Sequence, residues 1–348
     1  MQPALPTPRG PLSSALFRHW SDGSPLPVSE LSHRVDALTD DDLHLALWSC
    51  YELHYRGFAG VDDRLEWDPA TIAFRTRLEA AFEEALRDEH LSAAMPTDPM
   101  VALRVIATWA GPPLARTIQE HGGRAELAEF AIHRSAYQLK EADPHTWAIP
   151  RLAGPGRAAM IEIQADEYGD GKPGQAHAEL FARAMAELGL CPDFGYYVDH
   201  LPGVTLATDN LVSLFGLNRR LRGALVGHLA LFEMCSVAPM TRYLEAARRV
   251  GGLPALEHFY AVHVEVDAHH ARLALDEMVA PMVAFDPALA PDVIFGAAAL
   301  SRVERRFARH VLDAWDEGRS SLSDVSVEPP AAAVGAMPAA APDLVGVA

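Results

Sequence analysis

Hydrophobic positions recur every three to four residues along most of the chain, a period that predicts helices almost throughout. The first amphipathic stretch, Leu43–Tyr55, follows the acidic residues Asp40–Asp42, which are typical of a helix N-cap. Further helices are predicted at Pro69–Leu86, Met100–Thr108, Ala125–Lys140, Gly156–Glu167, Ala176–Leu188, Leu206–Val237, Leu256–Val279 and Pro287–Asp316. Alternating, strand-like runs are nearly absent, so the predicted fold class is all-α.

Both ends of the chain lack this helical period. Residues 1–31 are rich in Pro, Ser and Gly, and the tail 320–348 is low in charge and rich in Pro and Ala, so both are predicted to be disordered. The Gly-Pro-Pro run at residues 111–113 ends the early helices. We therefore expect an N-terminal helical subdomain over residues 32–114 and a larger helical bundle over residues 115–319.

Composition narrows the functional classes. The 348 residues are 49% hydrophobic, and 47 acidic against 29 basic residues give a net charge of −18. Nucleic acids and anionic membranes are bound by clustered Lys and Arg, so neither is expected as a partner. No apolar run reaches the roughly 18–20 residues of a membrane span, and the first residues do not resemble a secretory signal. The three cysteines are far apart and suggest no disulfide framework, so a cytoplasmic location is expected.

The most informative motif is His263-x₃-Asp267-x₂-His270, inside the last but one predicted helix. At about 100° per residue, offsets of four and seven return to nearly the same angle, so the three side chains share one helix face. The same face continues with apolar residues, namely Phe259, Val266 and Ala274. A buried charge requires a charged partner or a metal, and this ligand mix suits iron, manganese or zinc. A hydrogen-bonded His/Asp cluster without metal is the alternative, and this motif alone leaves both open.

Three further residues extend the candidate site. Glu233 continues a row of leucines four and eight residues before it, so it is either a ligand or a buried acid with a partner. Glu167 and His177 flank the segment YGDGKPGQA, whose glycines and proline break a helix. Helical spacing cannot place these two side chains on one face, so a loop that folds back is required.

Glu141 is a fourth additional candidate. It lies just before Asp143-Pro144, where a helix must end or kink. His145 is close enough in the sequence to compete with Glu141 as a ligand.

The order Glu167…His177…Glu233…His263-x₃-Asp267-x₂-His270 resembles the haem-oxygenase-like diiron oxidases and oxygenases. The runs QADEYGDG and HAELF are similar to the signature of bacterial proteins grouped as iron-containing redox enzymes. The resemblance covers roughly residues 125–315 and implies a haem-oxygenase-like helical bundle, with the N-terminal helices as an extension. It also implies that these six residues bind iron. Glu141 falls where at least one N-oxygenating member has an additional carboxylate.

The resemblance implies a non-haem enzyme that binds two Fe(II) ions per chain and uses O₂ to oxidise a small metabolite. N-oxygenation, C–C cleavage and desaturation are all reactions of this kind. The N-oxygenating member has a carboxylate three residues before the first His, where this chain has Gly174, and this difference favours the other reactions. The substrate is expected to be a small molecule, whereas its identity, an external electron donor and homodimer formation stay open.

Two other functional classes fit the residues. A single iron could be held by His263, Asp267 and His270 alone, as two imidazoles and one carboxylate. A metal-free helical protein, either a binding module or a thiaminase-like hydrolase, is the second class. Such a hydrolase would need a nucleophile, and Cys235, two residues after Glu233, is the cysteine that lies near the ligand motifs.

Overall fold

The computed structural model describes residues 2–27, 36–88 and 95–323, and within them the secondary structure is helical with no strand. The all-α prediction is therefore confirmed. The helices are α1 (Pro11–Asp22), α2 (Asp41–Glu52), α3 (Pro69–Asp88), α4 (Pro99–Ala107), α5 (Leu114–His121), α6 (Arg124–Gln138), α7 (Asp143–Thr146), α8 (Gly154–Glu167), α9 (His177–Leu188), α10 (Gly203–Leu217), α11 (Arg222–Val250), α12 (Pro254–Arg272), α13 (Ala280–Phe285) and α14 (Ala290–Asp316). Short 3₁₀ turns connect several of them, and a π-helical segment, Leu273–Val279, joins α12 to α13.

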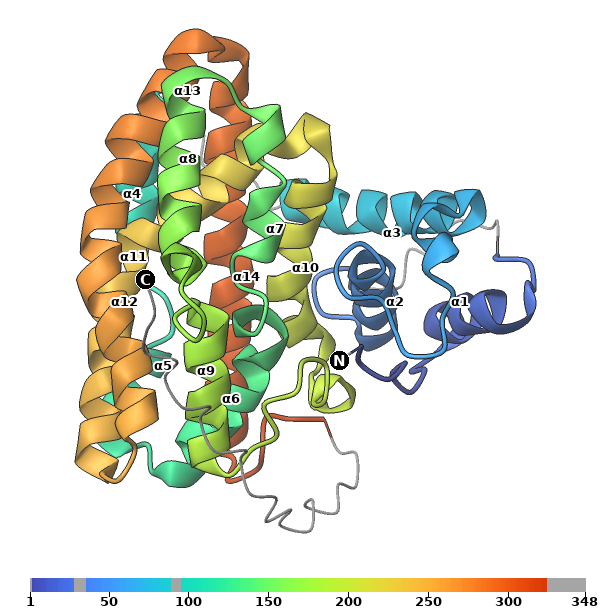
Figure 1. Ribbon diagram of the computed structural model, residues 1–348, viewed down its shortest axis with the longest axis horizontal. Helices are drawn as coiled ribbons and strands as arrows, with labels where there is room; N and C mark the ends of the chain where they lie inside the picture. The colour runs from blue at the N-terminus through green and yellow to red at the C-terminus, as the bar shows by residue number, and fades with distance from the viewer. Residues whose placement is uncertain (1, 28–35, 89–94, 324–348) are drawn as a thin grey trace, which may run out of the picture.

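The two long helices α11 and α14 form the centre of a bundle (Figure 1). Helix α12 packs along α11, α9 packs against α12, and α8 packs against the π-helical segment. Gly227 on α11 and Gly296 on α14 lie where the two helices cross, and a Cβ on either would clash with a backbone carbonyl of the other helix. These two glycines therefore allow the central helices to approach each other closely.

The segment Arg219–Val250, which contains α11, is long and apolar enough to cross a membrane by length and composition alone. Of its most apolar stretch, 67% is buried inside the protein. That burial is what the central helix of a bundle shows, because its apolar surface faces neighbouring helices on several sides.

Helices α1, α2 and α3 lie on one side of the bundle, where α2 packs against α10 (Figure 1). The predicted disordered arm 1–31 is wrong over its described part, because α1 is a helix that buries Leu16 and Trp20. Pro11 hid this helix from the sequence pattern, although a proline is well tolerated at the first helical position. Residues 28–31 of the arm and 324–348 of the tail lie outside the described residues.

Helix α4 lies before the boundary predicted near residue 114, and it packs on α11 and α14 of the bundle. Helix α5 begins at that boundary and packs on the same two helices. The group outside the bundle is α1–α3.

The single helix predicted over Leu206–Val237 is two helices, α10 and α11. Asn218 lies between them in an extended conformation, and its amide donates to the Leu214 carbonyl at 3.0 Å and to Glu79 at 3.0 Å. An Asn side chain that takes a helix carbonyl in this way competes with continuation of the helix. The sequence pattern did not indicate this break, because apolar residues continue on both sides of it.

A buried ion cluster joins α2 to the bundle. Lys140, one of two lysines in the chain, is 1% exposed, and its Nζ lies 2.8 Å from Glu52 Oε2 and 3.1 Å from Asp209 Oδ2. Nζ is also 4.6 Å from the centre of the Tyr55 ring. Burial lowers the pKa of Lys140, but the two carboxylates outweigh it and hold that pKa above its ordinary value. One ammonium group thus faces two buried carboxylates.

Replacing the buried lysine should destabilise the fold strongly. Lys140→Met leaves Glu52 and Asp209 buried without their cation, and breaking such a cluster costs roughly 3–5 kcal/mol. Urea denaturation should show this drop in the free energy of unfolding. The matched control is Lys172→Met, because Lys172 is 69% exposed and pairs with Asp170 at the surface. Equal stability of the two variants would contradict the role assigned to Lys140.

Candidate metal centre

Five segments bring seven ionisable side chains together inside the bundle, and each is at most 8% exposed. The turn after α6 contributes one residue, the end of α8 and the start of α9 one each, α11 one, and α12 three. These residues are Glu141, Glu167, His177, Glu233, His263, Asp267 and His270. All seven metal-ligand candidates of the sequence therefore lie in one region, including Glu141.

The loop between α8 and α9 folds back as its glycines predict. Glu167 is the last residue of α8 and His177 the first of α9, and Glu167 Oε2 lies 2.7 Å from His177 Nδ1. Gly169 has a φ of +66°, and a Cβ there would clash with the backbone of Gln175. Only glycine fits that close approach, so the loop can bring its two ends together.

The donor atoms fall into two groups, and within each group they lie no more than 4.8 Å apart. The first group is Glu141, His177 and His263, and the second is Glu167, Asp267 and His270. Glu167 lies between them, because its carboxylate is 2.7 Å from His177 Nδ1 and 3.8 Å from His270 Nδ1. Glu233 joins the second group, with Oε2 3.6 Å from His270 Nδ1.

Helix α12 places His263, Asp267 and His270 on one buried face, as predicted, but divides them between the groups. Seven residues of helix rise about 10 Å, so the two imidazoles are too far apart along the axis to serve the same ion. Carboxylates from other segments lie close to both imidazoles, since Glu141 is 3.6 Å from His263 Nε2 and Glu233 is 3.6 Å from His270 Nδ1.

The cluster contains buried polar atoms that form no hydrogen bond with a described residue, although two of them, Glu167 Oε2 and His177 Nδ1, face each other as an ion pair at 2.7 Å. They are Oε2 of Glu141, Oε2 of Glu167, Nδ1 of His177, Nε2 of His263 and Nδ1 of His270. Leaving such an atom unpaired in an apolar interior costs roughly 1–3 kcal/mol or more. The donor set, three imidazoles and four carboxylates, fits iron, which would satisfy these atoms.

Hydrogen bonds on the far side of two rings fix which nitrogen faces the cluster. His263 Nδ1 lies 2.8 Å from the Phe259 carbonyl, so Nε2 is left for a metal. His270 Nε2 lies 2.9 Å from Asp166 Oδ2, so Nδ1 is left. A carboxylate or carbonyl behind a metal-binding His orients the ring and makes it a better ligand.

Without metal, the cluster distributes its protons unusually. Burial lowers the pKa of His263, but the nearby Glu141 and the charges of other carboxylates raise it to about 10. Burial also lowers the pKa of His270, whereas Glu233 and Asp166 raise it to about 9. Burial raises the pKa of Glu233 to about 8. At pH 7, these three groups therefore hold protons that a metal must displace.

Metal binding should release more than one proton per chain at pH 7. The imidazoles of His263 and His270 bind a metal only when neutral, so affinity should rise with pH between 6 and 9, as their folded-state pKa values are approached. Anaerobic Fe(II) titration calorimetry in buffers of different ionisation enthalpy measures the proton count. Binding without proton release would show that the imidazoles are already neutral.

Sequence reasoning missed Asp166 and Tyr137. A His that binds a metal through one ring nitrogen usually donates a hydrogen bond from the other. Asp166, which directly precedes Glu167, could have been recognised as a candidate acceptor for that bond. Tyr137 lies one helical turn before Glu141 and lines the small space among the ligands. His145 does not compete with Glu141, because its Nε2 is 3.2 Å from His228 Nδ1 and it belongs to neither group.

Asp166→Ala should weaken Fe(II) binding by about 10–100-fold although it removes no ligand, because His270 loses the group that orients it. The matched control is Glu162→Ala, one turn earlier on α8, since Glu162 contacts the exposed His269 at 3.5 Å. Anaerobic Fe(II) titration of both variants tests this. Loss of affinity in both, or in neither, would contradict an orienting role for Asp166.

The fold and the site together define an all-α bundle whose buried centre of imidazoles and carboxylates could hold metal ions. Residues 128–305 match the family described as iron-containing redox enzyme, and the chain belongs to this family. Members of this family are described as redox enzymes that contain iron. All seven candidate ligands lie inside the matched region.

The chain is similar to a nitrosourea synthase from Streptomyces achromogenes subsp. streptozoticus, with 27% identity over 179 residues. The matched part covers 51% of this chain and 37% of that protein. The chain thus spans well under half the length of this relative.

Proposed function

We propose that this protein is a non-haem diiron oxidoreductase that uses O₂ to oxidise a small metabolite. The observation that carries the proposal is the arrangement of donor atoms in two groups with Glu167 between them. Four carboxylates, Glu141, Glu167, Glu233 and Asp267, would balance the +4 charge of two Fe(II) ions. Buried sites of this composition are typical of helical di-metal carboxylate proteins.

When bound, the iron pair would supply the electrons and open coordination positions for O₂ reduction. The protein contributes the surroundings. A space of about 10 Å³ among the ligands, on the scale of one water molecule, is lined by Tyr137, Leu229 and Phe232. Their apolar surfaces keep bulk water away from the reacting oxygen.

Amine nitrogen belongs among the atoms that this enzyme could oxidise, since a relative is named nitrosourea synthase. The Gly174 difference stays a prediction against N-oxygenation. Gly174 has a φ of +78°, its carbonyl accepts a hydrogen bond from Arg183 at 2.7 Å, and it adds no donor atom to either ligand group. Carbon and nitrogen oxidation both stay within the proposal. The cytoplasmic location also stays a prediction.

The alternatives have weaker support. A single iron on His263, Asp267 and His270 is disfavoured because their donor atoms belong to different groups. For a thiaminase-like hydrolase, Cys235 would have to be the nucleophile. Burial raises the pKa of the Cys235 thiol, which is the opposite of what activates a nucleophilic cysteine.

The protein should bind two Fe(II) ions per chain when it is loaded anaerobically. Asp267→Ala should lower the affinity for Fe(II) by at least 10–100-fold, because that is the loss when a residue that only supports a ligand is removed. The metal-free Asp267→Ala protein should be no less stable than the parent, because a buried carboxylate is gone. His269→Ala is the control, since His269 is exposed and outside both groups.

Iron stoichiometry and O₂ consumption by the Fe(II)-loaded protein measure these outcomes. One iron per chain would favour the mononuclear class, and no iron would favour a metal-free binding module. If Asp267→Ala binds Fe(II) as tightly as the parent, Asp267 is not a ligand.

A further inference from the structure

An apolar cavity of about 300 Å³ ends against the metal centre. Its inner wall includes Phe232, Ser236 and Phe259. Phe232 also lines the small space among the ligands, and the Phe259 ring centre lies 4.4 Å from that of His263. The Ser236 hydroxyl donates a hydrogen bond of 3.2 Å to the backbone carbonyl of the candidate ligand Glu233. One layer of side chains, Phe232, Ser236 and Phe259, would therefore separate a molecule in this cavity from the ligands.

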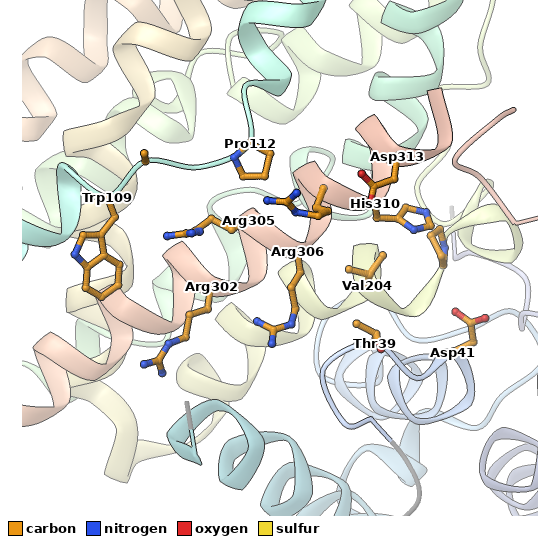
Figure 2. A pocket seen from close by; sticks show the side chains of 13 residues that line it. Thr39, Asp41, Trp109, Pro112, Val204, Arg302, Arg305, Arg306, His310 and Asp313 are labelled. Atoms are coloured by element: carbon orange, nitrogen blue, oxygen red, sulfur yellow. The ribbon is translucent and has the colours of Figure 1, made fainter. Parts of the chain in front are cut away.

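The other end of the cavity adjoins a larger one of about 990 Å³, because Trp109, Pro112 and Arg305 line both. Figure 2 shows Arg305 extending from α14 towards the side of Trp109, whereas Arg302 and Arg306 extend from the same helix away from the loop that carries Trp109 and Pro112. The two adjoining cavities are together called the path, and the larger, arginine-lined one is its mouth.

The mouth concentrates positive charge in a chain whose net charge is −18. Four arginines of α14 and His310 line it, against two acidic residues, Asp41 and Asp313. Arg305 and Arg309 are exposed, and neither makes a hydrogen bond or ion pair with any residue in the described ranges. Their guanidinium groups are available to an anion.

Apart from Arg305 at the mouth, the charged residues that line the apolar cavity are already paired. Arg134 binds Glu304 through two hydrogen bonds of 2.8 and 2.6 Å, so neither offers its charge to a ligand. Gln138 differs, because it is 5% exposed and its amide oxygen has no hydrogen-bond partner in the part of the chain that the structure describes. A buried amide without a partner requires one, and a ligand in the cavity could supply an N–H or O–H group.

We propose that this path binds an amphipathic organic anion of small size. Its apolar body would fill the inner cavity beside Gln138, its carboxylate would be held by Arg305 at the mouth, and the end remote from the carboxylate would face the metals. The assignment rests on the proposed function, since it names the substrate class of the same oxidising centre. A cavity of this volume and lining is typical of small-molecule sites.

Binding of matched pairs tests the assignment. Octanoate and 3-phenylpropionate are compared with octan-1-ol and 3-phenylpropan-1-ol by titration calorimetry, on metal-free and on anaerobic Fe(II)-loaded protein. At least one anion should bind about tenfold more tightly than its alcohol, the effect of one charge-assisted hydrogen bond. Arg305→Gln should abolish that preference and leave alcohol binding unchanged.

Two variants complete the design. Arg18→Gln, an exposed arginine on α1, should retain the preference for the anion. Ser301 lines the inner cavity, and the larger side chain of Ser301→Phe would occupy part of it. This variant should weaken binding of the anion and of the alcohol alike by at least tenfold, and circular dichroism checks that it folds. The inference is wrong if neither anion is preferred, if the preference survives Arg305→Gln, or if Ser301→Phe folds and binds as the parent does.

The design separates this inference from the proposed function. An Arg305-dependent preference in a protein that takes up no iron would overturn the proposed function and leave the anion site standing. Uptake of two irons with O₂ consumption, but without the preference, would overturn the anion site alone.

Discussion

A buried charge must be compensated, and this requirement governs both polar clusters inside the bundle. In the first cluster, the protein itself supplies the compensation, because Lys140 faces Glu52 and Asp209. In the second, three imidazoles face four carboxylates without a lysine or arginine among them, and five of these donor atoms have no hydrogen-bond partner among the described residues. The second cluster is thus built for a cation that the polypeptide does not provide.

The two clusters are neighbours in the sequence. Lys140 belongs to one and Glu141 to the other, so the turn after α6 links the N-terminal helices to the metal centre. Helices α1–α3 lie outside the part of the chain that matches the family. Glu52 of α2 nevertheless forms an ion pair with Lys140, the residue directly before the candidate ligand Glu141. The extension therefore contributes to the stability of the turn that positions Glu141.

The surroundings of the metal centre are asymmetric. On one side, Asp166 of α8 supports His270 near the surface. On the other, the apolar cavity leads away between aromatic side chains towards the arginines of α14. The side of the metal centre that holds Asp166 is thus polar. The cavity on the other side is lined mainly by apolar side chains, up to the arginines of the mouth. The residues that would balance the charge of a metal are therefore different from those that would recognise a small molecule.

The sequence alone determined the helical fold, the shared face of His263, Asp267 and His270, and the loop that joins Glu167 to His177. These features depend on residues close together in the chain, where helical period and glycine conformation decide the outcome. Tertiary structure decided what distant segments do to one another: Glu52 meets Lys140 across 88 positions, and Asp166 meets His270 across 104. It also placed Asp267 in the group of His270 and not in that of His263, because the other donors of each group come from other segments. No local pattern specifies such contacts, since they form only when the helices pack.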